Sequence, residues 1–223
     1  FVEALGLDAF KLFKQRKMAL FFIFSMFLGV SLQITNGYAN PFISSFAAMP
    51  EYQDVYFVDH ANLLISLSQI SETLCILLIP FFLKRYGIKR VMLIAMVAWA
   101  FRFGFFAIGN PSFPAVTWFI LSMIVYGVAF DFFNISGSLF VNNETDSSIR
   151  SSAQGLFMIM TNGIGASIGM LIAQAVVNNF TYSQEAGGQF YTVGEWPIVW
   201  GIFAAYALIV AIFFALIFKE KNQ

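Results

Sequence analysis

Three charged side chains lie inside long apolar stretches of this sequence: Glu72, Arg102 and Asp131. Placing a charge at the centre of a membrane-spanning helix costs roughly 3 kcal/mol. At about 1.5 Å of rise per residue, each of the three lies roughly 15 Å from the same end of its stretch, which is near the middle of a bilayer. We therefore expect these side chains to face a protein interior or a cavity, because lipid would leave their charges unsolvated.

Two acids and one base at the same depth could carry proton chemistry. If one acid pairs with Arg102, the other is left in a medium of low dielectric, where a carboxyl group can take up and release a proton. A base paired with one acid and a second acid that can exchange a proton are the minimum that a proton-coupled carrier needs. The alternative is that Glu72 and Asp131 are ion partners of Arg102 that only hold helices together.

Polar residues recur at helical spacing in two of the apolar stretches. The first stripe consists of Gly29, Gln33, Asn36 and Asn40. In the next stretch a second stripe consists of Asn62, Gln69, Glu72 and Thr73, with Gln69 and Glu72 one turn apart on the same face. Amide groups both donate and accept hydrogen bonds and carboxylates accept them, so this set suits a neutral ligand rich in hydroxyl groups. The alternative is that the amides hydrogen-bond neighbouring helices, at roughly 1 kcal/mol apiece.

Two aromatic residues adjoin the acid in the stretch around Asp131. Tyr126 and Phe130 are four residues apart and form an aromatic stripe, with Asn134 near its border. An aromatic ring offers a face on which a flat base can stack. Because aromatic residues make up 18% of the chain, the alternative is that both rings simply face lipid or the core.

The composition is that of an integral membrane protein. The 223 residues are 59% hydrophobic and 11% charged, and 29 of them are phenylalanine. Six apolar stretches are each long enough to cross a bilayer as a helix: 18–46, 61–83, 91–109, 115–141, 153–177 and 197–218. Their continuous hydrophobicity excludes the alternating pattern of a membrane barrel. Residues 1–17 form an amphipathic lead-in that we expect along the membrane surface.

Basic residues predict the orientation of the six spans, because Lys and Arg near span ends stay in the cytoplasm. They gather before the first span, between spans two and three, between four and five, and after the sixth: Lys11, Lys14, Arg16, Lys17, Lys84, Arg85, Lys89, Arg90, Arg150, Lys219 and Lys221. Loops 47–60, 110–114 and 178–196 contain none. Both termini are therefore predicted to be cytoplasmic, with Trp196 and Trp200 anchoring the last span in the opposite interface.

Glycines mark the fifth apolar stretch as a helix that packs closely or bends. Gly165 and Gly169 have the GxxxG spacing that lets two helices approach. The chain also begins without an initiator methionine, so we expect residue 1 not to be the start of the native polypeptide.

Several classes of protein are excluded. The formal net charge is zero, which gives no reason to expect a nucleic-acid partner, and the single cysteine, Cys75, excludes an internal disulfide. No metal-ligand spacing, nucleophile motif or phosphate-binding loop is present, so we expect neither a metal, a cofactor nor an enzyme site.

The chain is similar over nearly its whole length to a known family. The segments that carry the likeness are FFIFSMFLGVSLQITN, SQISETLCILLIPFFLKRYGIKRVM, MIVYGVAFDFFNISGSLFV and SSAQGLFMIMTNGIG. Together they resemble the C-terminal half of the bacterial nucleoside:proton symporters, or nucleoside permeases, of the major facilitator superfamily. The likeness fades at 47–59 and 178–196. Lys84 also stands where the loop motif of the superfamily usually has an acid.

This resemblance implies a fold, a mechanism and a set of roles. The fold is an all-α six-transmembrane-helix bundle, one half of a twelve-helix transporter whose N-terminal six-helix half is absent here. The implied function is proton-driven nucleoside uptake across the bacterial inner membrane by alternating access. The residues assigned to nucleoside binding are Gln33, Asn36, Gln69, Glu72, Tyr126 and Phe130. Asp131 is assigned to proton coupling, with Arg102 and Asn134 in support.

Two other functions remain open at this point. A sugar:proton symporter of the same superfamily would use similar polar stripes, and competition between uridine and a disaccharide would separate the two. A non-transporting six-helix assembly or channel subunit is favoured only if residue 1 is close to a true start. The implied partners of the transporter are the nucleoside, protons, the lipid bilayer and the missing half.

Overall fold

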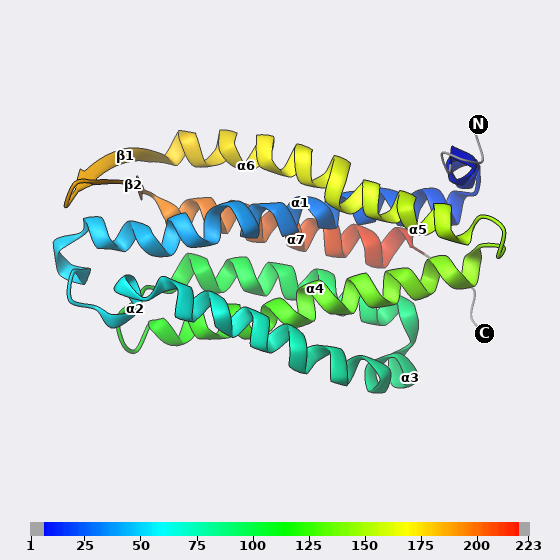
Figure 1. Ribbon diagram of the computed structural model, residues 1–223, viewed down its shortest axis with the longest axis horizontal. Coiled ribbons are helices and arrows are strands. Elements are labelled where there is room, and N and C mark those ends of the chain that lie inside the picture. The colour runs from blue at the N-terminus through cyan, green and yellow to red at the C-terminus, as the bar shows by residue number, and fades with distance from the viewer. Residues whose placement is uncertain (1–6, 219–223) are drawn as a thin grey trace.

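The computed structural model describes residues 7–218, which form an all-helical bundle with one small hairpin (Figure 1). Within these described residues, five helical runs are long and apolar enough to cross a membrane. They are α1 (Arg16–Ser45), α3 (Ala61–Ile108), α4 (Val116–Glu144), the continuous run of α5 (Arg150–Met158), η4 (Ile159–Gly165) and α6 (Ala166–Phe180), and α7 (Trp196–Ile217). The short helical pieces are η1 (Leu7–Lys14), η2 (Phe46–Ala48), η3 (Pro50–Tyr52) and α2 (Tyr56–Asp59).

Helix α3 accounts for the difference between six predicted stretches and five long helices. Its 48 residues would measure about 72 Å if straight, more than twice the thickness of a bilayer core. Gly87, with φ 76° and ψ 169°, breaks the helical geometry, in a region of backbone space that glycine enters without steric cost. The chain turns back there (Figure 1). We name residues 61–86 the first leg and 88–108 the second leg.

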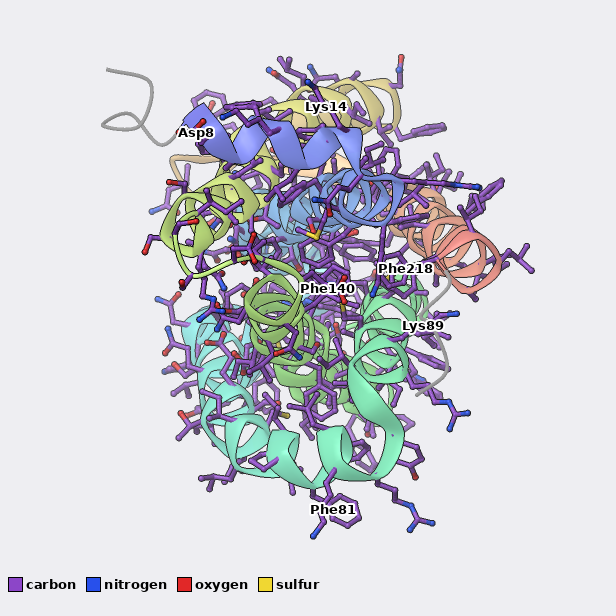
Figure 2. All side chains as sticks on the ribbon, turned by 90° about the vertical axis from the view of Figure 1, so that its right-hand side faces the viewer. Asp8, Lys14, Phe81, Lys89, Phe140 and Phe218 are labelled. Atoms are coloured by element: carbon purple, nitrogen blue, oxygen red, sulfur yellow. The ribbon has the colours of Figure 1, made fainter. Side chains whose placement is uncertain are left out.

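The two ends of the bundle differ in charge. The first and last described residues, the turn at Gly87 and the connection from α4 to α5 all lie at one end (Figure 1), and Figure 2 looks onto that end with Lys14 and Lys89 labelled. We name it the basic end. The segments 46–60, 109–115 and 181–195 at the opposite end contain no Lys or Arg. Residues 1–6 of the predicted lead-in, and Lys219 and Lys221, lie outside the described residues.

Glycines bring α1 against the run of α5, η4 and α6. A Cβ added at Gly29 of α1 would lie 2.0 Å from the Thr161 carbonyl oxygen in η4. One added at Gly165 would lie 2.4 Å from the Met26 carbonyl, and one at Gly169 would lie 2.8 Å from the Val30 Cα. The two backbones therefore touch, which confirms the close approach predicted from the GxxxG spacing. The turn at η4 is a π-helix, which the sequence analysis did not predict.

The tryptophans of α7 correct another prediction. Trp196 is 2% exposed and Trp200 is fully buried, so neither is an anchor that faces the membrane interface. The Trp200 ring packs against Phe42, Phe103 and Phe106, with ring centroids 4.8–5.7 Å apart. With 18% aromatic residues, this protein fills its interior with rings, and position at a span end did not distinguish an interior tryptophan from an exposed one.

A β-hairpin joins α6 to α7 at the end opposite the basic end. Strands β1 (Thr181–Ala186) and β2 (Gln189–Gly194) pair antiparallel, with Ala186 opposite Gln189. The turn residues Gly187 and Gly188 both have positive φ, 58° and 78°, the geometry that two-residue hairpin turns require. A hairpin thus stands where a loop was predicted over 178–196, and the Gly-Gly pair at its turn is a recognised hairpin signal.

Candidate functional site

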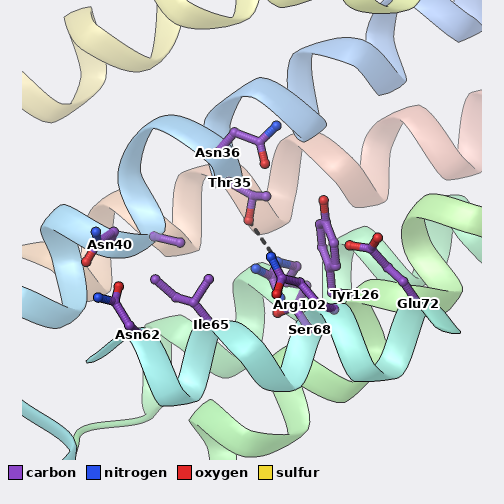
Figure 3. A pocket seen from close by; sticks show the side chains of 11 residues that line it. Thr35, Asn36, Asn40, Asn62, Ile65, Ser68, Glu72, Arg102 and Tyr126 are labelled. Atoms are coloured by element: carbon purple, nitrogen blue, oxygen red, sulfur yellow. Dashed lines mark hydrogen bonds between the residues drawn. The ribbon is translucent and has the colours of Figure 1, made fainter. Parts of the chain in front are cut away.

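A polar pocket of about 410 Å³ lies between α1, both legs of α3, and α4 (Figure 3). Two of its lining residues, Ala39 and Ile65, are apolar. Its polar lining consists of Thr35, Asn36, Asn40, Asn62, Ser68, Gln69, Glu72, Arg102 and Tyr126. Such a concentration of hydrogen-bonding groups, inside helices that are otherwise rich in Phe, Leu and Ile, can hydrogen-bond a polar ligand.

Arg102, only 3% exposed, is anchored by three hydrogen bonds to two neighbouring helices. Its Nε donates to the Thr35 hydroxyl of α1 at 2.8 Å, as Figure 3 shows. Its Nη1 donates to the Ser122 carbonyl of α4 at 2.8 Å, and the Ser122 hydroxyl donates back to the Arg102 carbonyl at 2.9 Å. These bonds tie the second leg to two neighbouring helices and fix the guanidinium in one place.

The guanidinium also lies against an aromatic cluster. Its Cζ is 4.4 Å from the centroid of the Tyr126 ring, within the range of a cation–π contact. Trp99 meets the same ring edge-on at 5.8 Å, and Phe130 stacks parallel to it at 5.8 Å with an interplanar angle of 2°. Tyr126 is therefore held in a fixed orientation with part of its surface in the pocket.

Neither intramembrane acid forms an ion pair with Arg102. Within residues 7–218 the ion pairs are Lys11–Asp8 and Lys17–Glu144, so no carboxylate oxygen comes within 4.0 Å of the guanidinium. Glu72 is half-buried and lines the pocket, close enough to Arg102 for their opposite charges to interact. The predicted pairing was wrong in this detail, because neutral acceptors and aromatic rings already surround Arg102.

Asp131 is buried without a complete set of partners. It is 6% exposed, and in the described part of the chain its buried Oδ2 accepts no hydrogen bond. Its charge lies close enough to Glu72 for the two to repel. A buried carboxylate with an unpaired oxygen and a like charge nearby is costly, and taking up a proton relieves both penalties.

The structure places five of the nine predicted residues on the pocket: Asn36, Gln69, Glu72, Arg102 and Tyr126. Four others do not line it: Gln33, Phe130, Asp131 and Asn134. Since α1 runs away from the basic end and α4 runs toward it (Figure 1), all four lie on the basic-end side of the lining residues of their own helices. Gln33, Phe130 and Asn134 are half-buried there.

Four further lining residues were not among the predicted site residues: Thr35, Asn40, Asn62 and Ser68. Asn40 and Asn62 belong to the two polar stripes predicted from helical spacing, although neither was assigned a role in the site. The two hydroxyl residues gave no such signal, because Ser and Thr inside helices usually bond to their own backbone.

The bond between Thr35 and Arg102 gives a first prediction. We expect Thr35→Val to destabilise the protein by about 2 kcal/mol, because a buried charged donor loses its acceptor while the side-chain shape is kept. The measurement is the thermal unfolding of the complete protein in detergent. Thr73→Val is the matched control, since the Thr73 hydroxyl is exposed and bonds only to the Gln69 carbonyl of its own helix. Equal unfolding temperatures for the two variants would contradict the anchoring role.

Comparison with known proteins places the chain in a family. The family model described as nucleoside H+ symporter matches residues 1–223. The chain is 54% identical over 219 residues to the xanthosine permease of Escherichia coli K12 and 51% identical over 218 residues to the nucleoside permease NupG of the same organism. Each alignment covers 98% of this chain and 50% of the relative.

This chain is also similar to solved structures of one of these relatives. The crystal structure of the nucleoside transporter NupG matches with a TM-score of 0.86 at 51% identity, over 97% of this chain and 51% of that one. Its D323A mutant matches with a TM-score of 0.89 at 51% identity, over 98% of this chain and 52% of the other. The chain thus spans about half the length of the relatives it matches.

Proposed function

Because the chain belongs to the nucleoside H+ symporter family, we propose that it forms the C-terminal half of a proton-coupled nucleoside transporter. The observation that carries this proposal is the polar pocket, in which amides, a carboxylate, an anchored guanidinium and a phenol meet inside apolar helices. This set of donors and acceptors matches the hydroxyl groups of a ribose and the edges of a base. A preceding six-helix half closes the other side of the cavity.

The proposed topology has six crossings, counting the two legs of α3 separately. The basic end faces the cytoplasm, with both termini, since Lys and Arg concentrate there and are lacking in the described segments at the other end. Transport proceeds by rocking of the two halves around the pocket, which gives alternating access to a site near the midplane. The membrane is the bacterial inner membrane.

Within the pocket, the amides of Asn36 and Gln69 hydrogen-bond the nucleoside, and Gln33 assists from the adjoining turn. Glu72 accepts hydrogen bonds from the ribose hydroxyls. Tyr126 or Phe130 offers a ring face to the base, a role supported by their rigid parallel stacking. Asp131 carries the coupled proton, supported by its unpaired buried oxygen. Arg102 holds Tyr126 in place, with Asn134 as a polar neighbour of Asp131.

The role of Glu72 supplies the test of this function. In the complete transporter, Glu72→Gln is expected to weaken uridine binding about 10- to 100-fold, because a charge-assisted hydrogen bond to a hydroxyl contributes about 1.5–3 kcal/mol. The measurement is a binding titration by calorimetry on purified protein. Glu185→Gln, an exposed change in the hairpin, is the matched control.

Two outcomes would count against the proposal. If Glu72→Gln binds uridine as tightly as the unmodified protein, the ribose assignment is wrong. If a disaccharide displaces bound uridine at equal concentration, the pocket is better read as that of a sugar:proton symporter.

A further inference from the structure

A second hollow, of about 400 Å³, lies on a different face of the second leg of α3. Five apolar side chains between Leu93 and Phe101 line it, together with Val125 and Val128 of α4. None of these residues lines the polar pocket. Val125 directly precedes the pocket residue Tyr126, and Phe101 directly precedes Arg102, so the hollow and the pocket occupy different faces of the same two helices.

The hollow has the length and surface of a site for a hydrocarbon chain. It lies within helices apolar enough to span a membrane, and Phe101 at its far end is 55% exposed. Ala98 is only 5% exposed and, with its small side chain, leaves room between Ile94 and Phe101. From Arg90 to Phe101 the helix rises about 16 Å, close to the depth of one leaflet in a bilayer core of about 30 Å.

Two cationic residues, Lys89 and Arg90, precede the lining of the hollow on the side of the basic end. Arg90 precedes Ile94 by one turn, and Lys89 precedes Leu93 by one turn, so both lie above the lining side chains on the same face. Figure 2 shows Lys89 on the outer flank of the bundle. Within residues 7–218 neither has a carboxylate within 4.0 Å. Cations without an ion-pair partner, one turn before the lining of an apolar groove, match the charge pattern of an anionic lipid.

We propose that this groove binds one anionic phospholipid, with an acyl chain along Ile94, Val97 and Phe101 and the headgroup phosphate between Lys89 and Arg90. Both parts of the lipid contribute to its binding. The cations select a negative headgroup, and the groove over Ala98 holds the chain in one position on the protein surface. This site is separate from the nucleoside pocket and does not depend on which substrate that pocket takes.

The headgroup half of the proposal is tested on the purified, delipidated complete transporter by native mass spectrometry with added phosphatidylglycerol. The double variant Lys89→Gln, Arg90→Gln is expected to bind the first phosphatidylglycerol about 10-fold more weakly. The matched control is Lys84→Gln, Arg85→Gln, which removes the same charge on the other side of Gly87 and is expected to bind nearly as well as the unmodified protein. Phosphatidylcholine is expected to bind weakly and equally to all three proteins.

Equal phosphatidylglycerol binding by the unmodified protein and the Lys89, Arg90 variant would overturn the site. Equal losses in the two double variants would do so as well, since they would mean that only diffuse surface charge attracts the lipid.

The acyl-chain half is tested by Ala98→Leu, which fills the floor of the groove. We expect about a 10-fold loss of phosphatidylglycerol affinity, against no loss for Ala205→Leu at an exposed position on α7. A second measurement covers the case in which Ala98→Leu fails to fold. Glycerophosphoglycerol, the headgroup without acyl chains, is expected not to displace phosphatidylglycerol from the unmodified protein, and displacement at equal concentration would overturn the role of the groove.

Discussion

Replacing Asp131 by asparagine is expected to abolish proton-driven accumulation of nucleoside by the complete transporter while nucleoside binding remains measurable. Asparagine keeps the size and a hydrogen-bonding capacity of the side chain but cannot exchange a proton. With an inward gradient of one pH unit, a symport of one proton per nucleoside can concentrate substrate up to about 10-fold, since one pH unit is worth about 1.4 kcal/mol. With the Asp131→Asn protein, the nucleoside concentrations inside and outside should become about equal.

The measurement is uptake of labelled uridine into proteoliposomes with and without the pH gradient, alongside a binding titration. Asp146→Asn serves as the matched control, because Asp146 is an exposed aspartate in the connection from α4 to α5. The structural basis is the unpaired Oδ2 of Asp131 and the like charge of Glu72. Undiminished accumulation by the Asp131→Asn protein would assign the proton to another residue.

The second large effect is expected at Gly29, where a single added methyl group should destabilise the fold. In Gly29→Ala the new Cβ would sit 2.0 Å from the Thr161 carbonyl oxygen and 2.7 Å from its carbon. Because both partners are backbone, no side-chain rotation can relieve the clash, and α1 and η4 must move apart. We expect a cost of about 3 kcal/mol or more, and therefore a lower unfolding temperature.

Thermal unfolding of the purified complete protein, followed by size-exclusion chromatography after heating, measures this effect. Gly155→Ala in the adjoining helix is the matched control. A Cβ at Gly155 would meet no atom within 4 Å, and alanine favours a helix over glycine by about 1 kcal/mol, so this variant should be at least as stable as the unmodified protein. Equal unfolding temperatures for the two variants would contradict the tight contact.

The sequence predicted those features of the molecule whose alternatives would carry a large free-energy cost. Burying Arg102 and Glu72 in an apolar segment is so costly that an interior location could be predicted without any structure, and both line the pocket. The family resemblance is confirmed by the match over residues 1–223. The close approach at Gly165 and Gly169 was likewise predictable, because the absence of side chains at a four-residue spacing has few other uses in membranes.

Features that depend on competition between similar partners could not be predicted. Arg102 was expected to pair with an acid. In the structure its guanidinium donates hydrogen bonds to Thr35 and to a backbone carbonyl, and it lies over the ring of Tyr126. Sequence spacing fixes depth but not which of several neighbours lies within hydrogen-bond distance. Trp200 was expected at the interface for the same reason, since a depth near the span end says nothing about the direction in which the side chain points.

The π-helix η4 changes the rotational phase of the span that contains it. In a π-helix each N–H bonds to the carbonyl five residues back rather than four. The seven residues of η4 therefore contain one residue more than the same length of α-helix would. Because an α-helix turns 100° per residue, this extra residue changes the direction in which the following side chains point. Gly169 faces α1 in this shifted phase. A helical wheel drawn through 150–180 as one uninterrupted α-helix therefore misplaces the face of α6 that meets α1 relative to α5. Deleting one residue from η4 is expected to rotate Gly169 away from α1.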